Sequence, residues 1–264
     1  MGNPVCVFLE SEGLNAEDMQ KIARWTNLSE TTFVSRSEKA DYKVRIFTPL
    51  NELPFAGHPT LGTAWALKAA GVIKKDTLVQ ECAFGLIHIQ FADSKVFFEL
   101  PHYIDQELAL DAEISAAVGL PVRQGRLITT GPKWVVSELA VDPNILSLAI
   151  DPKPFINLMR SLKAEGITVY SIVNRGVINV RTFFESIDGI VEDPVCGSGN
   201  AAVGVHLMKT GKAGSVVNLH YEAHQGETLQ RDGRVSVMLG DKIKVGGSCN
   251  VVLEGTAHIA PDLS

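Results

Sequence analysis

Two segments of this chain, far apart in the sequence, share one pattern. Segments 55–67 and 195–207 each begin with small turn residues and continue into a nearly uniformly apolar stretch, and Gly57 and Gly197 hold equivalent places 140 residues apart. A helix without a polar face is a buried helix, and the free backbone N–H groups of its first turn favour an anion. We therefore expect two similar halves, each built around a buried helix whose N-terminus faces a shared cleft.

Composition limits the classes of protein to consider. The 264 residues suit one large domain or two ordinary ones, and 45 % hydrophobic with 20 % charged residues is typical of a globular core. A net charge of −6 argues against nucleic acid as a partner. The chain shows no apolar run long enough for a membrane span and no secretory-signal pattern. Four cysteines without metal-binding spacing indicate reduced thiols, so we expect a cytoplasmic protein.

The local patterns predict many strands and few helices in each half. This mixture favours an α+β duplication over a regular βαβ alternation. Besides the two central helices, which Gly71 and Gly211 end, helices are predicted at 15–26, 111–118 and 155–165, and residues 101–110 as a crossover. Strands are predicted at 31–34, 42–47, 78–81, 86–91, 95–100, 125–130, 133–140, 168–173, 177–184, 216–222, 234–239, 243–245 and 250–254.

The turn at 192–199 is the first candidate for chemistry. It lacks the Gly-Lys-Ser/Thr ending of a Walker A loop, and Ala202 stands where a dinucleotide fingerprint needs its third glycine. A plain glycine-rich helix entry is an equally good interpretation. His58 lies in the matching turn of the first half, opposite Ser198, which favours a place in the cleft over a simple cap. Glu30, between a helix and a strand, is by pattern alone an exposed carboxylate.

A metal site is considered and set aside. His220, Glu222 and His224 alternate along one face of a predicted strand, as metal ligands do. The solvated face of a half-exposed strand explains the same alternation, and we favour it because no zinc-type spacing accompanies these residues. We expect neither a metal nor a cofactor.

Several strings together resemble one known family. They are Asn27-Leu28-Ser29-Glu30-Thr31-Thr32-Phe33, the stretch 45–59 ending in Phe55-Ala56-Gly57-His58-Pro59, and Glu192-Asp193-Pro194 with Gly197-Ser198-Gly199-Asn200-Ala201-Ala202. Gly2-Asn3-Pro4-Val5 and Thr130-Gly131-Pro132-Lys133-Trp134 fit as well. The chain resembles the PhzF-like family, the phenazine-biosynthesis isomerases and their relatives, over almost its whole length.

The resemblance implies a diaminopimelate-epimerase-like fold of two pseudo-symmetric domains, each with a mixed sheet around a central helix. The domains expected are 1–110, joined by the C-terminal strand at about 250–264, and 111–249. It further implies a homodimeric, cofactor-independent isomerase that moves a proton between carbons of a small carboxylate-bearing metabolite, with the active site between the domains. The implied catalytic residues are Glu30, His58, Asp193 and Ser198, and the implied substrate-binding residues are Ser29, Gly57, Gly197 and Gly199.

Two departures from related patterns matter. Diaminopimelate epimerases carry a cysteine at each turn, whereas this chain has Cys196 at the second turn and Ala56 at the first. A racemase or epimerase using Cys196 with Glu30 is therefore the alternative function, and a non-catalytic metabolite-binding protein is another. The family also has a strand before its Gly-Asn-Pro segment. We accordingly expect an open sheet edge beside residues 5–9, filled by another segment or used in a subunit contact.

Overall fold

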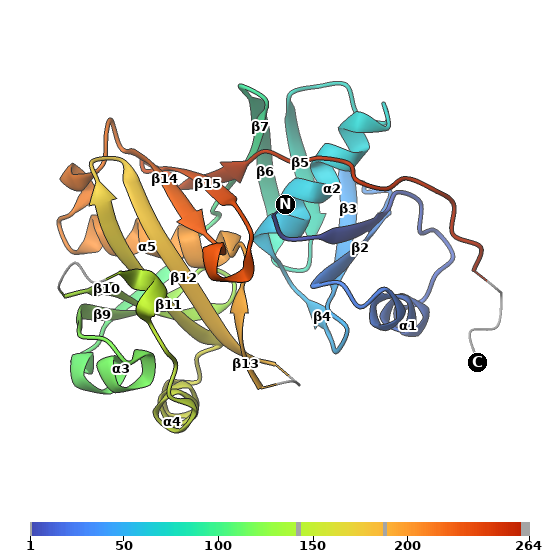
Figure 1. Cartoon of the computed structure of the whole chain (residues 1–264). Helices are drawn as coiled ribbons and strands as arrows, with labels where there is room; N and C mark the ends of the chain where they lie inside the picture. Colours follow the sequence, from blue (N-terminus) through green and yellow to red (C-terminus); the bar gives the residue numbers. More distant parts are fainter. Residues whose placement is uncertain (1, 141–143, 187–188, 260–264) are drawn as a thin grey trace. The chain divides into compact units, whose positions relative to one another are not determined.

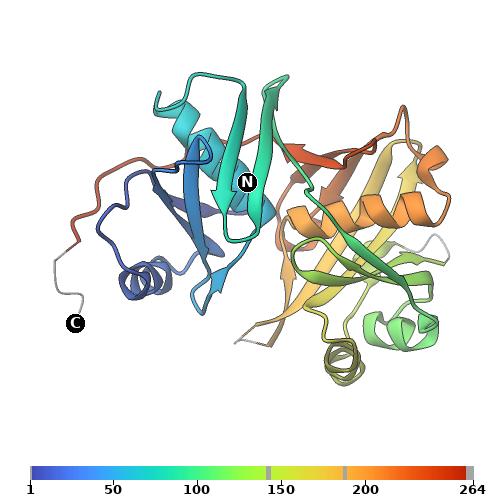
Figure 2. The same cartoon turned by 180° about the vertical axis from the view of Figure 1, so that it is seen from behind.

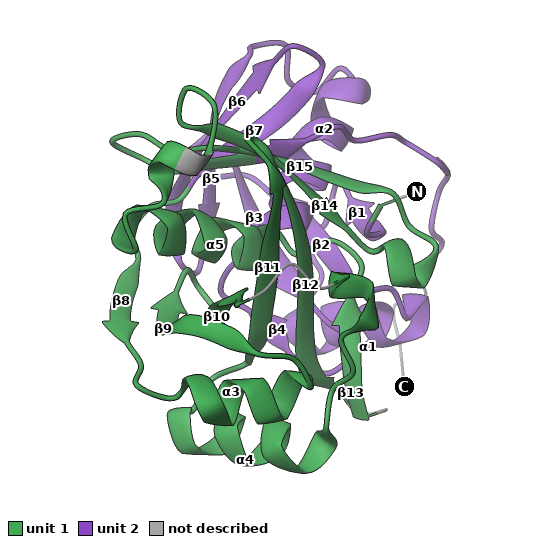
Figure 3. Cartoon of the chain, turned by 60° about the vertical axis from the view of Figure 1, so that its left-hand side comes forward, with its two compact units in different colours: residues 1–2, 100–245 green, residues 3–99, 246–264 purple. Residues whose placement is uncertain are grey.

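The computed structural model describes residues 2–140, 144–186 and 189–259, and the chain divides into two compact units (Figure 3). Unit 1 comprises residues 1–2 and 100–245, and unit 2 comprises residues 3–99 and 246–264. The segment of unit 2 that begins at residue 3 ends at residue 99, 11 residues before the boundary expected at 110. The reason is β8 (Ile104–Glu107), which pairs with β9 (Val122–Thr129) and so belongs with the later strands.

Unit 2 is a mixed sheet with a helix on each face (Figure 1). Its strands follow the order β1-β2-β3-β5-β6-β7, with β4 paired to β3. β1 runs parallel to β2, and β3 runs parallel to β5, while the remaining pairs are antiparallel. The elements are β1 (Val5–Phe8), α1 (Ala16–Thr26), β2 (Glu30–Ser35), β3 (Tyr42–Phe47), β4 (Glu52–Leu53), α2 (Gly57–Ala69), β5 (Thr77–Cys82), β6 (Gly85–Ala92) and β7 (Lys95–Glu99).

α1 forms where the sequence predicts it. Asn15 caps its N-terminus by accepting a hydrogen bond from the Asp18 N–H at 3.0 Å, and Asn27 ends it in the left-handed conformation. Its buried residues Met19, Ile22 and Ala23 pack on phenylalanines of the sheet. On α2, Gly62 permits a close approach to β1, because a Cβ there would lie 2.5 Å from Val5 Cγ1. The sheet of unit 2 therefore carries α1 and α2 on its faces.

Unit 1 repeats this plan with more strands. Their order is β15-β14-β12-β11-β10-β9-β8, and β13 pairs with β12. The elements are β8, α3 (Asp111–Val118), β9, β10 (Lys133–Leu139), α4 (Pro152–Leu162), β11 (Gly166–Asn174), β12 (Val177–Ser186), β13 (Gly189–Asp193), α5 (Gly197–Lys209), β14 (His220–Gln225) and β15 (Gly233–Met238). Three short 3₁₀ turns are η1 (Ile145–Ser147), η2 (Ala213–Ser215) and η3 (Glu227–Leu229), and β16 (Lys244–Gly247) leads back into unit 2.

Strand alternation gives the sheet of unit 1 two different buried faces. Val135 and Phe183 belong to the cluster that packs against α3 and α4. Their neighbours Trp134 and Thr182 point to the opposite face, where α5 lies across the strands (Figure 2). At the first turn of α5 a Cβ on Gly199 would lie 3.0 Å from Thr182 Oγ1, so this approach requires glycine. The start of α5 is thereby fixed against the sheet.

The two central helices confirm the internal repeat. α2 and α5 begin at Gly57 and Gly197 and contain 13 residues each. α5 is buried on all sides through residue 207, as its apolar sequence predicts. α2 differs, because Trp65 and Lys68 on its C-terminal half are only partly buried. No helix in the described part of the chain is long and apolar enough to cross a membrane.

Four local predictions are wrong. β8 lies within the expected crossover, and β13 extends into the turn expected from residue 192 onward. Residues 216–219 precede β14 instead of belonging to it, because Asn218 and Leu219 turn the chain at positive φ between Val217 and His220. Residues 250–254 form no strand, since no neighbouring strand pairs with them, and Val252 and Leu253 are 72 % and 92 % exposed. Residues 260–264, in the expected C-terminal strand, lie outside the described residues.

The edge expected to be open is the outer edge of β1. Within the described residues β1 pairs with β2 alone and stands last in the strand order of unit 2. No strand in the described part of the chain pairs with its other side, which is the position of an edge strand.

His206, on α5, makes the stability of unit 1 depend on pH. Its Nε2 lies 2.6 Å from the Gln124 carbonyl, which can only accept, so Nδ1 accepts from the Tyr170 hydroxyl at 3.0 Å. Burial lowers the pKa of His206 to about 4. The unfolded chain, with a histidine pKa near 6.5, binds a proton as the pH falls from about 6.5 to about 4, whereas His206 in the folded chain stays neutral. Protonation therefore favours the unfolded state in this range.

We expect a loss of roughly 3 kcal/mol of unfolding free energy across that window, complete near pH 4 and absent above about pH 7. His206→Gln will be less stable at neutral pH but will lose this part of the acid dependence. Urea unfolding of the wild-type and His206→Gln proteins at about pH 7 and about pH 4.5 measures the loss of unfolding free energy in each. Equal losses in both proteins would contradict the assignment.

Candidate functional site

Glu30 and His58 meet in unit 2. Glu30 is the first residue of β2, and His58 lies in the first turn of α2. Glu30 Oε2 lies 3.1 Å from His58 Nε2, and the two side chains are only 15 % and 16 % exposed. Nε2 also lies 3.4 Å from the Pro4 carbonyl, which can only accept, so Nε2 carries a proton directed at Pro4. Glu30 Oε2 is buried and forms no hydrogen bond within the described chain.

This arrangement is unusual for a buried carboxylate. Buried polar atoms are nearly always hydrogen-bonded, and an exception in a native fold calls for an explanation. Around Glu30, Ser29 donates a hydrogen bond to the Asn3 amide oxygen at 2.9 Å. The first turn of α2 has no side-chain cap, because its N-cap residue is Ala56. Unit 2 thus brings together Ser29, Glu30, Gly57 and His58, four of the residues singled out in the sequence.

Unit 1 contributes the second group of residues. Asp193 ends β13, and its Oδ1 accepts a hydrogen bond from the Val195 N–H at 3.0 Å, which forms the turn into α5. Cys196 is the N-cap of α5, and its Sγ accepts from the Gly199 N–H at 3.3 Å. No hydrogen bond within the described chain involves the N–H groups of Gly197 and Ser198. This turn is therefore a set of fixed backbone donors beside a carboxylate.

Two residues that hold this turn were not among the predicted site residues. Gln225 Oε1 accepts from the Cys196 N–H at 3.1 Å, and Gln225 Nε2 donates to the Asp193 carbonyl at 3.0 Å. Trp134 Nε1 donates to Ser198 Oγ at 3.1 Å. An indole N–H only donates, so it occupies a lone pair of Ser198 Oγ and leaves the serine proton for another acceptor, with Cys196 Sγ 3.7 Å away. The Gly-Pro-Lys-Trp string was the available signal for Trp134, whereas Gln225 had none.

Cys196 is poorly suited to act as a thiolate. Its side chain is buried, and burial together with the neighbouring Asp193 charge raises the pKa of the thiol well above its ordinary 9.0. At neutral pH the sulfur is therefore protonated, and its structural role is to cap α5.

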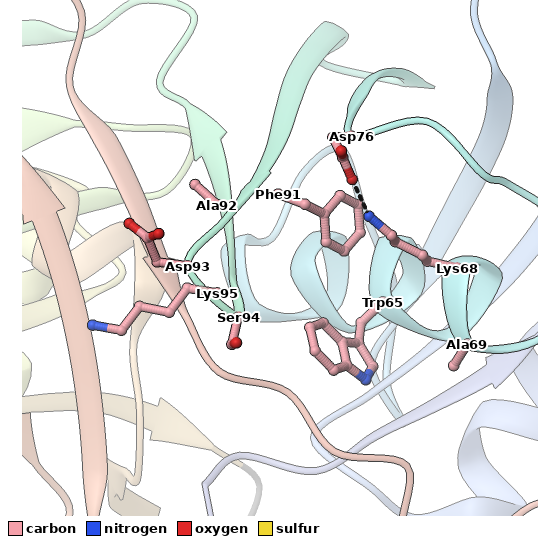
Figure 4. Close-up of a pocket in the computed structure, with 9 residues that line it drawn as sticks. All are labelled: Trp65, Lys68, Ala69, Asp76, Phe91, Ala92, Asp93, Ser94 and Lys95. Atoms are coloured by element: carbon pink, nitrogen blue, oxygen red, sulfur yellow. Dashed lines mark hydrogen bonds and ion pairs between the residues drawn. The ribbon is translucent and has the colours of Figure 1, made fainter.

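A cavity of about 420 Å³ in unit 2 is distinct from these residues (Figure 4). It lies beside the C-terminal half of α2, away from the turn that holds His58, and none of the predicted site residues lines it. Lys68 stands against the Phe91 ring, 4.1 Å from its centroid, and pairs with Asp76. Its charge is thus already compensated by the Asp76 carboxylate.

The alternating residues of β14 are engaged in local contacts. His220 Nε2 lies 2.7 Å from Ser236 Oγ, and His224 Nε2 lies 3.0 Å from Glu222 Oε1. Among the described residues no group of three or more His, Cys, Asp or Glu side chains is placed to hold a metal ion.

Comparison with known proteins identifies the family of this chain. A family model of phenazine biosynthesis-like proteins matches residues 1–261. The chain belongs to the PhzF family. A relative in Schizosaccharomyces pombe, "Antisense-enhancing sequence 1", is 34 % identical, and the match covers 98 % of this chain and 94 % of the relative. The trans-2,3-dihydro-3-hydroxyanthranilate isomerase of Pseudomonas aeruginosa is 35 % identical with the same coverage.

The crystal structure of a PhzF-family phenazine biosynthesis protein from Bacillus anthracis matches with a TM-score of 0.80 at 25 % identity, over 94 % of this chain and 91 % of that one. The expected α+β, diaminopimelate-epimerase-like fold is thereby confirmed. Because several relatives of nearly the full length are named isomerases, the expectation of an isomerase is confirmed for this PhzF-family chain at the level of enzyme class.

Proposed function

We propose that this PhzF-family chain is a cofactor-independent isomerase in which Glu30 moves a proton between two carbons of a small carboxylate-bearing metabolite. The observation that carries the proposal is the buried Glu30 Oε2, which has no hydrogen bond within the described chain and lies beside His58. A general base must keep a lone pair free for the proton it removes. A carboxylate held in this way has its lone pair available.

In the proposed reaction the Glu30 carboxylate removes a proton from one carbon, the electron pair shifts the double bond, and Glu30 returns the proton to another carbon. Glu30 is therefore a carboxylate again after each turnover, and no oxidant or reductant is needed. The protonated Nε2 of His58 provides a nearby positive dipole. Asp193, Ser198 and the N–H groups of the second turn orient the substrate in the proposed reaction.

The substrate carboxylate is assigned to backbone donors. Gly57 at the start of α2 and Gly197 and Gly199 at the start of α5 lie at helix N-termini, which favour anions. Ser29, fixed by Asn3, borders Glu30 and completes the proposed binding residues. Homodimeric assembly and a cytoplasmic location stay predictions.

The test is solvent deuterium incorporation. The protein is incubated in deuterated buffer with small carboxylates, beginning with trans-2,3-dihydro-3-hydroxyanthranilate, the substrate named for the 35 % identical relative. Mass spectrometry and NMR then locate any incorporated deuterium. An isomerase moves a double bond as well. Exchange at a single carbon with no shift of the double bond would instead support a racemase or epimerase, and absence of exchange across the panel would favour a binding protein.

The racemase alternative depends on Cys196, and its buried, protonated thiol disfavours it. We expect Cys196→Ser to retain activity within severalfold, because serine is an equally good N-cap for α5. Steady-state kinetics with the substrate found above measures this, with circular dichroism as the check on folding. Complete loss of turnover in a folded Cys196→Ser protein would restore the thiol to the mechanism.

A further inference from the structure

A second cavity, of about 400 Å³, lies in unit 1 on the sheet face opposite α5. Arg181 lines it and shares a strand face with Phe183, which packs against α3 and α4. The cavity opens where β14 leaves β12, because these strands pair only over three residues, and the loop around η3 borders it. It shares no residue with the proposed catalytic set.

Most charges in this cavity are already compensated. Arg181 and Glu192 form a bidentate pair at 3.0 and 2.7 Å, and Thr228 adds a hydrogen bond to Glu192 at 2.7 Å. Arg234 pairs with Asp232 at 2.6 Å. His224 lies against Glu222, which is also within 4.0 Å of Arg234. These groups form the fixed polar walls of the cavity.

Two charged side chains in the lining of this cavity form no hydrogen bond or ion pair within the described chain. They are Arg231, which is half-buried, and Glu227, which is exposed. The backbone holds both in one short loop, since the Arg231 N–H donates to the Gly226 carbonyl at 2.9 Å and the Gln230 N–H donates to the Glu227 carbonyl at 3.0 Å. The lining of the cavity therefore includes one cation and one anion, on the same short loop, that have no partner within the described chain.

From this pairing we infer that the cavity is a binding site for a small zwitterion of the α-amino acid class. Arg231 binds the carboxylate, for which a guanidinium provides parallel donors, and Glu227 binds the ammonium group. The volume lies in the range of small-molecule sites. The remaining polar lining, Asn179 and Gln230, suits a ligand with a polar side chain. The site is separate from the proposed isomerase reaction and does not depend on it.

The experiment is an NMR titration of the whole chain, which needs no catalytic activity. L-alanine and L-glutamine, which differ in size, are compared with propionate and glutaramate, which lack the ammonium group. We expect saturable shifts of the amide signals of residues 226–234 with at least one amino acid, with a Kd in the millimolar range or tighter and at least tenfold preference over its deaminated partner. No saturable shift with either amino acid would overturn the inference.

Single substitutions test the roles proposed for the Arg231 and Glu227 charges. Arg231→Gln should weaken amino-acid binding at least tenfold, whereas Arg160→Gln, the same change on the exposed surface of α4, should leave it unchanged. Glu227→Gln should remove the preference for the amino acid over its deaminated partner while carboxylate binding persists. Arg231→Lys keeps the charge and serves as the second variant if Arg231→Gln fails to fold. Equal affinity in the wild-type, Arg231→Gln and Arg231→Lys proteins would disprove the site.

Discussion

Replacing Glu30 by glutamine should reduce turnover by about 10³-fold, within the range expected when a general acid–base group is lost. The amide has nearly the same shape as the carboxylate but cannot accept a proton from carbon. Because Glu30 Oε2 makes no hydrogen bond within the described chain, the substitution breaks none there, and the fold should be retained. We expect KM to change far less than kcat. Steady-state kinetics and deuterium exchange both measure the effect.

The matched control is Glu17→Gln on the exposed side of α1, where Glu17 forms a surface pair with Lys21. That variant should keep wild-type turnover. The proposed mechanism fails if Glu30→Gln, with an intact circular dichroism spectrum, turns over at a rate near that of the control.

Arg181→Met should lower the unfolding free energy by about 3–5 kcal/mol, the usual cost of removing one partner from a buried ion pair. The Arg181 and Glu192 side chains are only 9 % and 7 % exposed. Arg181 also donates to the carbonyls of Ile145 at 3.2 Å and Leu148 at 2.9 Å. Within the described chain, the substitution therefore leaves the Glu192 carboxylate with only the Thr228 hydroxyl as donor, and removes the Arg181 donor from two carbonyls. Urea denaturation at neutral pH measures the change.

The chain provides a close comparison for this prediction. Arg45 and Glu52 form a bidentate pair with similar distances, both 2.7 Å, but their side chains are 30 % and 37 % exposed. Arg45→Met should cost no more than about 1 kcal/mol, because solvent screens that pair. Similar losses for Arg181→Met and Arg45→Met would show that burial does not determine the contribution of the Arg181 pair.

The local parts of the fold and site were predictable from the sequence. The starts of α2 and α5 follow from small turn residues before apolar runs, signals contained within a few neighbouring positions. β13 was missed because it is short and half-buried, and its sequence contains Glu192 and Asp193. The predicted strand at 250–254 has strand-forming residues but no partner, and strand propensity without a neighbour does not make a strand.

The candidate site shows the same limit. Glu30 was singled out from a resemblance, since its own pattern indicated only an exposed carboxylate. Its burial depends on β2 and α2 meeting, which no local signal encodes. The role of Gln225 likewise could not be predicted from local sequence, because its hydrogen bonds reach a turn that lies about thirty residues earlier in the chain. Long-range hydrogen-bond partners become visible only when the strands are assembled.

The return of the chain from unit 1 to unit 2 has a consequence for biosynthesis. Gly246 lies against β7, where a Cβ would be 2.3 Å from Phe97 Cδ1, and Ile259 packs on the cluster that contains Phe33. A ribosome synthesises these residues about 150 positions after the rest of unit 2. Unit 1 is nearly continuous from residue 100 to 245 and has all of its strands before then. Unit 2, whose synthesis begins first, is therefore completed after unit 1. A nascent chain that stops near residue 245 contains all strands of unit 1 but lacks the C-terminal segment that packs on unit 2.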